Sequence, residues 1–195
     1  MNFSEISNQL SRFRVGIAGA GGLGSNCAVA LARSGIGTLV IADFDIVEEN
    51  NLNRQYYFTD QVGLMKVIAL RDNISRINQD VSVVTYQKKL DRSNISQIFS
   101  GCDVVVEAFD ISDMKEMLIE TLQVEMPVTP LVIGSGIAGW GNNEAIRYRK
   151  IDNTLFVCGD ETFEISENMP PMAPRVGIVA NMQANVVIEI LLQKK

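Results

Sequence analysis

The sequence predicts an α/β fold in which a doubly wound, mainly parallel sheet carries an antiparallel hairpin and a terminal helix at its C-terminal end. Five apolar segments of strand length alternate with segments whose apolar residues recur at helical spacing. Segments that are apolar throughout are typical of parallel strands covered on both faces. Alternating strands and helices imply right-handed crossovers and one shared sheet.

The elements of the doubly wound part follow one another in regular order. The strands are expected at residues 14–18, 38–42, 81–86, 104–106 and 128–133. The helices between them are expected around residues 24–34, 67–77, 95–99 and 114–122. Gly35 is expected to end the first helix in a left-handed conformation, Ser93 to cap the short third helix, and Pro127 to introduce the fifth strand.

The C-terminal third departs from this alternation. Glycines punctuate a loop after the fifth strand, at Gly134, Gly136, Gly139 and Gly141. Two short segments, 145–149 and 154–157, then indicate an antiparallel hairpin that extends the sheet. The acidic, proline-bearing stretch 159–174 is expected to form a surface crossover loop, and 176–192 a final helix that closes the core.

Length, charge and cysteine content narrow the function classes. A chain of 195 residues suits a single domain, which we assign to residues 1–195. A net charge of −6 argues against non-specific nucleic-acid binding, which depends on clusters of basic residues. Three cysteines without a Cys-x-x-Cys pair, and no histidine, leave no zinc-site pattern, and the odd cysteine number fits a reducing cytoplasm.

One uncharged stretch, residues 15–32, has the length of a short membrane span or leader and follows Arg12 and Arg14. Its five glycines and its change from strand to helix periodicity favour a buried strand, turn and helix instead. We therefore expect a soluble protein without a membrane partner.

A glycine-rich turn follows the first expected strand and opens the first helix. Gly19 permits a tight turn, Gly21 removes a side chain that would block an anion, and Gly24 allows close helix–strand packing. Bare backbone N–H groups and the helix dipole favour a phosphate there. Asp43 follows Gly24 by 19 residues, at the tip of the second strand, where a carboxylate accepts hydrogen bonds from ribose hydroxyls and repels a 2′-phosphate. The pattern predicts a Rossmann-like nucleotide site that disfavours NADP without choosing between ATP and a dinucleotide.

Motifs along the rest of the chain resemble those of the ThiF/MoeB family of ubiquitin-activating-like adenylyltransferases. Besides the glycine-rich turn they are Asp43-Phe44-Asp45, Asn51-Leu52-Asn53-Arg54-Gln55, Gly63-Leu64-Met65-Lys66, Glu107-Ala108-Phe109-Asp110 and Pro171-Met172-Ala173-Pro174-Arg175-Val176-Gly177. The resemblance covers about the whole chain and is closest to the short ThiF-like proteins associated with thiamine synthesis.

The resemblance implies a reaction with ATP and the residues that serve it. ATP would adenylate the C-terminal carboxylate of a small ubiquitin-fold sulfur carrier protein, ThiS-like, and the enzyme would be a cytoplasmic homodimer. Arg54 and Lys66 are expected to grip the triphosphate and Asp110 to hold magnesium, and these three form the expected catalytic set. The other expected nucleotide-binding residues are Gly19, Gly21, Gly22, Gly24, Asp43, Asp45, Asn51 and Gln55.

Several of these residues leave other interpretations open. Asp45 also fits a turn cap, Asp110 also fits a cap for the helix near Ser112, and Trp140 fits either a groove for the carrier's tail or a cover of the core. Cys158, at an expected strand end, is the only cysteine considered for sulfur chemistry.

The sequence departs from the family pattern before the first strand. Relatives carry an Arg-Gln pair there, whose arginine reaches the partner subunit's ATP, whereas residues 1–13 lack the pair and leave Arg12 as the candidate substitute. A non-catalytic nucleotide-binding subunit that docks a carrier stays an alternative, as does activation of another carboxylate or of a tRNA base. The absence of histidine disfavours an NAD-linked oxidoreductase, which usually needs a proton acceptor, but suits adenylation because a carboxylate is already ionised at neutral pH.

Overall fold

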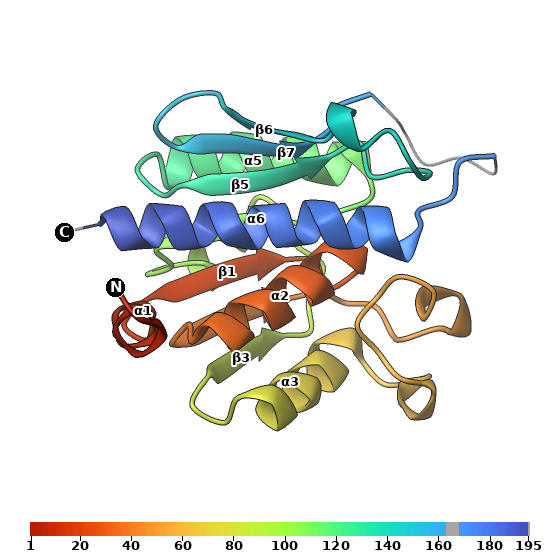
Figure 1. Cartoon of the computed structure of the whole chain (residues 1–195), viewed down its shortest axis with the longest axis horizontal. Helices are drawn as coiled ribbons and strands as arrows, with labels where there is room; N and C mark the ends of the chain where they lie inside the picture. Colours follow the sequence, from red (N-terminus) through yellow and green to blue (C-terminus); the bar gives the residue numbers. More distant parts are fainter. Residues whose placement is uncertain (163–167, 195) are drawn as a thin grey trace.

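One twisted sheet runs through the part of the chain that this computed structural model describes, residues 1–162 and 168–194 (Figure 1). Within these residues the sheet has seven strands in the order β3-β2-β1-β4-β5-β7-β6. They are β1 (Arg14–Ala18), β2 (Thr38–Ala42), β3 (Ser82–Tyr86), β4 (Val104–Glu107), β5 (Leu131–Ser135), β6 (Arg147–Lys150) and β7 (Leu155–Gly159). Neighbouring strands are parallel except for β6 and β7, which form the edge hairpin, so the predicted mainly parallel sheet with an antiparallel extension is confirmed.

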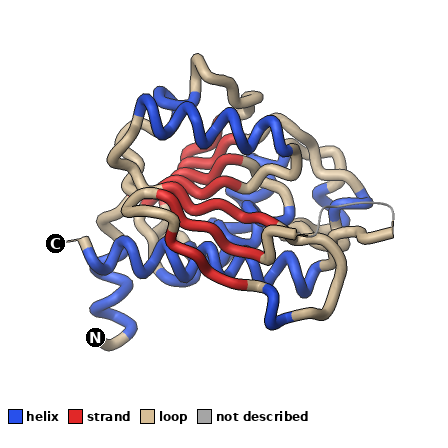
Figure 2. The backbone as a smooth tube through the Cα atoms, turned by 90° about the horizontal axis from the view of Figure 1, so that it is seen from above, coloured by secondary structure: helices blue, strands red, loops and turns tan. Residues whose placement is uncertain are grey.

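Helices cover both faces of the sheet, as the view from above shows (Figure 2). On one face α1 (Phe3–Leu10), α2 (Gly22–Ser34), α3 (Lys66–Ile77) and α6 (Ala173–Gln193) share an apolar core with the strands. On the other face α4 (Ile95–Ile98) and α5 (Ser112–Glu125) share a second core. Short 3₁₀ turns lie in the loops at η1 (Glu49–Asn51), η2 (Thr59–Gln61) and η3 (Asn143–Ala145).

The central strand β4 explains why the strands are apolar throughout. Val104 and Val106 belong to the core beneath α2 and α6, whereas Val105 belongs to the core beneath α4 and α5. Successive side chains of a strand point to opposite faces, so a strand covered on both faces needs apolar residues at every position. The polar exception is Glu107, which is fully buried and forms an ion pair with Lys115 of α5.

Several boundaries differ from the expected ones, and at two places a local contact explains why the expectation was wrong. β5 begins at Leu131 and not at residue 128, because Val128 is 85% exposed in the turn that precedes the strand. Ser93 does not cap α4, because its N–H and hydroxyl donate to Asp91 while Asn94 takes the cap position.

The two ends of the chain meet at the amino-terminal edge of the sheet (Figure 1). α1 is not among the expected elements, and its short amphipathic pattern buries only Leu10. The predicted terminal helix is confirmed as α6, which has the length and composition of a membrane-spanning helix but packs along α2 and the sheet, with Val176, Val179 and Val187 fully buried. Of the expected crossover loop, residues 163–167 lie outside the described residues, and α6 already begins at Ala173.

Candidate functional site

A cavity of about 270 Å³ opens at the carboxyl ends of β1, β2 and β4. Ligands of doubly wound sheets bind at this edge, where parallel strands end together. The expected site residues that line the cavity are Gly19, Gly21, Gly22, Asp43, Asp45, Arg54, Gln55, Lys66 and Asp110. The fold therefore brings the glycine-rich residues, both expected cations and the expected metal anchor to one place.

Close packing accounts for two glycines in residues 19–24, the turn between β1 and α2 that we call the glycine turn. Gly19 has a φ of 98°, and a Cβ there would lie 2.9 Å from the carbonyl oxygen of Ala108. A Cβ on Gly24 would lie 1.9 Å from the carbonyl oxygen of Gly19, which confirms its predicted packing role. A Cβ on Gly21 would have its nearest neighbour, Gln55 Nε2, 3.8 Å away, so glycine here leaves room for a ligand.

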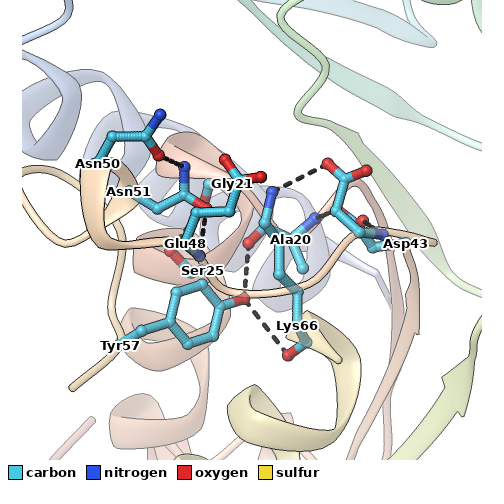
Figure 3. Close-up of polar contacts among 10 residues, drawn as sticks. Ala20, Gly21, Ser25, Asp43, Glu48, Asn50, Asn51, Tyr57 and Lys66 are labelled. Carbon is cyan, nitrogen blue, oxygen red and sulfur yellow. Dashed lines mark hydrogen bonds and ion pairs between the residues drawn. The ribbon is translucent and has the colours of Figure 1, made fainter. Parts of the chain in front are cut away.

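Hydrogen bonds hold the backbone of the glycine turn (Figure 3). Asp43 Oδ2 accepts from the Ala20 N–H at 2.6 Å, and the Tyr57 hydroxyl donates to the Ala20 carbonyl at 2.7 Å. Ser25 Oγ donates to the Gly21 carbonyl at 2.6 Å. The carbonyl oxygens are thus taken up by side chains that do not line the cavity, and an anion in the cavity meets N–H groups rather than carbonyl oxygens.

Asp43 stands at the end of β2 with both carboxylate oxygens engaged. Besides the bond to Ala20, Oδ1 accepts from the Asp45 N–H at 2.8 Å. Burial raises the pKa of the Asp43 carboxyl above its ordinary value, while the two backbone N–H bonds and Lys66 oppose the rise. Each carboxylate oxygen accepts more than one hydrogen bond, so the side chain keeps acceptor capacity for a ligand hydroxyl.

The two basic residues reach the cavity in different ways. Lys66 is the first residue of α3, its side chain is 8% exposed, and its ammonium group lies 3.0 Å from the Asp45 carboxylate. Arg54 is more open, and its guanidinium donates to the Asn50 carbonyl at 3.0 Å and to the Asn53 side chain at 2.8 Å. A partly desolvated cation attracts a phosphate more strongly than a solvated one, so Lys66 offers the stronger electrostatic contact.

Asp110 lies exposed in the turn between β4 and α5, where it lines the cavity. Ile111 occupies the cap position of α5 and no side chain caps that helix, so the alternative role of Asp110 as a helix cap is wrong. Glu107 shapes the turn, because its Oε1 accepts from the Phe109 N–H at 2.7 Å. No group of three or more His, Cys, Asp or Glu side chains gathers in the described residues, so a metal ion at Asp110 would need further ligands from a bound substrate.

Gln55 supplies an unused buried acceptor beside the glycine turn. The residue is 9% exposed, and its Oε1 has no hydrogen-bond partner among residues 1–162 and 168–194. An unsatisfied buried polar atom costs about 1–3 kcal/mol, which a ligand hydroxyl such as that of ribose would recover. Together with Asp43 and the two cations, this acceptor fits a nucleotide that carries several phosphates.

The structure keeps Asn51 and Gly24 out of the cavity lining and brings in two lysines that were not expected. The Asn51 side chain accepts from the Glu48 N–H at 3.1 Å and donates to Asn50 at 2.8 Å, so it serves a local turn. Lys88 and Lys89, just after β3, line the cavity. The sequence could have indicated this, because a pair of lysines that follows a predicted parallel strand is expected at the edge of the sheet where ligands bind.

Arg12 and the cysteines do not line the cavity. Arg12 precedes β1, whose five residues span about 16 Å, so it lies away from the cavity of its own chain, and its expected role towards a partner subunit's ATP stays a prediction. Burial raises the pKa of Cys102 to about 11 and that of Cys158 to about 12, and it raises the pKa of Cys27 as well. Because the thiolate is the reactive form, these buried thiols favour the structural interpretation of Cys158.

The fold and the cavity define a class, an α/β nucleotide-binding protein whose glycine turn and paired cations face the carboxyl edge of a parallel sheet. A family model described as the ThiF family matches residues 3–195. The chain belongs to the ThiF family.

Relatives and solved structures extend this result. The chain is 34% identical over 181 residues to the adenylyltransferase and sulfurtransferase UBA4 of Eremothecium gossypii, covering 92% of this chain and 38% of that protein. It is 37% identical over 132 residues to the SAMP-activating enzyme E1 of Haloferax volcanii, covering 67% of this chain and 48% of that protein. The chain thus spans less than half the length of these relatives. The Escherichia coli tRNA N6-threonylcarbamoyladenosine dehydratase TcdA, solved with ATP, has a TM-score of 0.87 at 21% identity, covering 97% of this chain and 90% of that chain, which shows a shared fold.

Proposed function

We propose that the chain is an ATP-dependent adenylyltransferase that activates the C-terminal carboxylate of a small ubiquitin-fold sulfur carrier protein, ThiS-like, for sulfur transfer in thiamine biosynthesis. The observation that carries the proposal is the convergence of the glycine turn, Arg54, Lys66 and Asp110 on one cavity. Membership of the ThiF family and the names of the UBA4 and SAMP-activating relatives support the adenylyltransferase part of the proposal, whereas the assignment to thiamine biosynthesis rests on the resemblance of the motifs. We further propose that the enzyme acts as a cytoplasmic homodimer.

The polar groups of the cavity suit the parts of ATP. The ribose hydroxyls would meet Asp43 and Gln55, and the phosphates would meet the N–H groups of the glycine turn together with Arg54 and Lys66. The apolar side chains of Leu90 and Met114 line another part of the cavity and suit the base.

Adenylation brings two anions together, and the cations serve this step. A carboxylate oxygen of the carrier attacks the α-phosphorus, the bond from that phosphorus to the oxygen that bridges the β-phosphate breaks, and pyrophosphate leaves. The attacking carboxylate is ionised at neutral pH, so a chain without histidine needs no general base for it. Lys66 and Arg54 stabilise the charge that develops on the phosphates. Mg²⁺, held by Asp110 and phosphate oxygens, would add neutralisation of the leaving pyrophosphate.

The end of β5 and the loop that follows it, residues 134–141, offer the carrier's tail a path, and we call this segment the glycine floor. Ile137 of this loop lines the cavity, so the floor leads to the nucleotide. Gly139 and Gly141 have φ values of 74° and 66°, and Trp140 between them is 68% exposed. A diglycine tail has no side chains and suits an approach past the exposed residues Trp140 and Gly141.

Carrier-dependent exchange of labelled pyrophosphate into ATP tests the proposal. We expect exchange with a ThiS-like carrier that ends in Gly-Gly and none with the same carrier lacking its last glycine. Asp110→Asn should abolish exchange, whereas the matched control Asp113→Asn, on the exposed first turn of α5, should leave it unchanged. ATP binding without exchange would instead indicate a non-catalytic docking subunit, and exchange that depends on tRNA would indicate the base-activating alternative.

A further inference from the structure

Tyr57 lies behind the glycine turn, and nothing in the sequence motifs assigns it a role. The residue is 6% exposed and does not line the cavity. Its hydroxyl lies 2.7 Å from the Ala20 carbonyl oxygen and 3.4 Å from the Lys66 carbonyl oxygen (Figure 3). A phenol has one proton to donate, and the shorter distance places that proton on the Ala20 oxygen.

The geometry of one peptide unit links this hydroxyl to the cavity. The peptide between Ala20 and Gly21 is trans, and in a trans planar peptide the C=O and N–H bonds point in opposite directions. With the Ala20 oxygen turned to Tyr57, the Gly21 N–H is turned away from it, and Gly21 lines the cavity. Among the described residues the Gly21 N–H has no hydrogen-bond partner within the protein.

Neighbouring contacts leave this peptide little freedom. The Ala20 N–H is held by Asp43 Oδ2 at 2.6 Å, and the Gly21 carbonyl accepts from Ser25 Oγ at 2.6 Å. In the described residues the Tyr57 hydroxyl is the one donor that reaches the Ala20 carbonyl. Glycine at position 21 has no Cβ to restrict its rotation, so the orientation of its N–H depends on these contacts.

We propose that Tyr57 is a positioning residue for phosphate recognition, whose hydroxyl holds the Ala20–Gly21 peptide so that the Gly21 N–H donates to a phosphate of the nucleotide. The inference rests on the proposed function only in taking a polyphosphate nucleotide as the ligand. It differs from a packing role because the ring alone suffices for packing, whereas the orientation of the peptide requires the hydroxyl.

The protonation state of the phenol agrees with a permanent donor. Burial, followed by the charges of Asp43 and Asp45, holds the pKa of Tyr57 well above its ordinary value. The hydroxyl therefore keeps its proton over the pH range in which the protein works.

Tyr57→Phe removes the hydroxyl and keeps the ring, and Tyr56→Phe is the matched control. The Tyr56 hydroxyl faces Arg33 at 3.5 Å, away from the glycine turn. Calorimetric titration should show that Tyr57→Phe weakens the binding of ATP and of pyrophosphate about tenfold, the effect of one lost hydrogen bond to a charged group, while adenosine binds as to wild type. Tyr56→Phe should bind all three ligands as wild type does.

Two results would overturn the inference. Equal losses for adenosine and ATP in Tyr57→Phe would assign the hydroxyl a merely structural role, and unchanged binding of ATP would assign it none. If the wild-type protein binds neither ATP nor pyrophosphate, the proposed function fails together with the inference. If the wild-type protein and the Tyr57→Phe variant bind ATP equally well, only the inference fails.

A measurement on the wild-type protein keeps the test independent of the variant's folding. In protein labelled with [¹⁵N]glycine, pyrophosphate should shift the amide resonance of Gly21, identified by its loss in Gly21→Ala, while the resonance of Gly101, in the exposed turn before β4, stays in place. A Gly21 resonance that pyrophosphate leaves unmoved would contradict the proposal.

Discussion

The two glycine-rich segments at the cavity, the glycine turn and the glycine floor, use the same residue type for different physical reasons. In the glycine turn, a Cβ on Gly19 or Gly24 would meet backbone carbonyl oxygens at 2.9 and 1.9 Å. In the glycine floor, a Cβ on Gly134 would lie 2.4 Å from the Leu23 side chain and one on Gly136 1.9 Å from the Asp160 carboxylate. Further along, a Cβ on Gly139 would meet only the side chain of Met169 at 3.1 Å, and one on Gly141 would meet nothing within 4 Å. Glycine therefore serves tight packing against backbone in the turn, whereas in the floor it serves packing against side chains at the start and a left-handed backbone at the tip.

The hydrogen bonds that hold the two segments also differ. The glycine turn is held at consecutive residues, as expected where backbone must face a phosphate in one orientation. The glycine floor is held at more widely spaced residues: Lys115 donates to the Gly134 carbonyl at 2.6 Å, the Gly139 N–H donates to the Pro170 carbonyl at 3.0 Å, and Arg175 donates to the Gly141 carbonyl at 2.5 Å. The segment proposed to meet the phosphates is thus held more continuously than the segment proposed for the carrier's tail.

The largest effect on stability is expected at Lys115, which contacts the first residue of the glycine floor. Lys115→Met leaves the fully buried Glu107 without its cation and should lower the free energy of unfolding by about 3–5 kcal/mol at pH 9, measured by urea unfolding. Burial already raises the pKa of Glu107, and Lys115 opposes the rise, so the variant's folded state binds a proton more tightly than its unfolded state does. Part of the stability lost at pH 9 should therefore return at pH 6, and the contribution of the buried charge should vanish only below the ordinary pKa of a glutamate.

The control for this variant is a surface pair of the same kind. Lys194→Met removes a contact to Asp103 in which both side chains are partly exposed, and it should change the free energy of unfolding by less than about 1 kcal/mol. An equal loss in Lys115→Met at pH 9 and pH 6 would contradict the buried charge as the cause.

The next largest effect is expected in the glycine turn. Gly24→Ala places a methyl group against the Gly19 carbonyl and should cost about 3 kcal/mol of unfolding free energy, together with ATP affinity. Gly177→Ala in α6 is the matched control, because a Cβ there meets nothing within 4 Å and alanine favours a helix. A Gly24→Ala protein as stable as wild type would show that α2 and β1 are not packed as described.

Lys66→Met tests whether the positive charge beside the glycine turn stabilises the transition state of adenylation. We expect pyrophosphate exchange to fall about a hundredfold, the usual effect of removing one group that stabilises charge in the transition state. Arg71→Met, on the exposed side of the same helix, should leave exchange unchanged. The Lys66 variant should unfold near the wild-type urea concentration, because its partner Asp45 is 48% exposed and is solvated without it. A fall in Arg71→Met equal to that in Lys66→Met would point to a general effect of charge.

The smallest effect is expected at the tip of the floor. Gly141→Ala meets no atom but has a φ of 66°, so it should cost about 1 kcal/mol and leave ATP affinity as in wild type. The KM for the carrier should rise a few fold if the tail passes over this residue. A loss of ATP affinity in Gly141→Ala would erase the distinction between the two glycine segments.

Local sequence patterns predicted helices and strands well where the feature depends only on residues close together in the chain. The apolar run 38–42 became β2 with its predicted bounds, and Gly35 ends α2 with a φ of 90°, because both features depend on a few adjacent residues. The same reasoning placed Val128 in a strand, since an apolar residue beside others does not reveal that a turn exposes it. α1 escaped prediction because it contributes only one fully buried side chain.

The candidate site, like the fold, was predicted in part from the sequence. The sequence predicted the residue types and, through the family motifs, the roles proposed for them: glycines for a phosphate, Arg54 and Lys66 for charge, and Asp110 for a metal ion. Only the tertiary structure decided that Asn51 serves a local turn while Lys88 and Lys89 line the cavity. The sequence by itself thus determined the strands, the helices other than α1, and the glycine turn, because those depend on neighbours a few positions apart. Contacts such as that of Tyr57 with Ala20, 37 positions away along the chain, were decided by how the turn between β1 and α2 packs against the loop between β2 and α3, which no local pattern encodes.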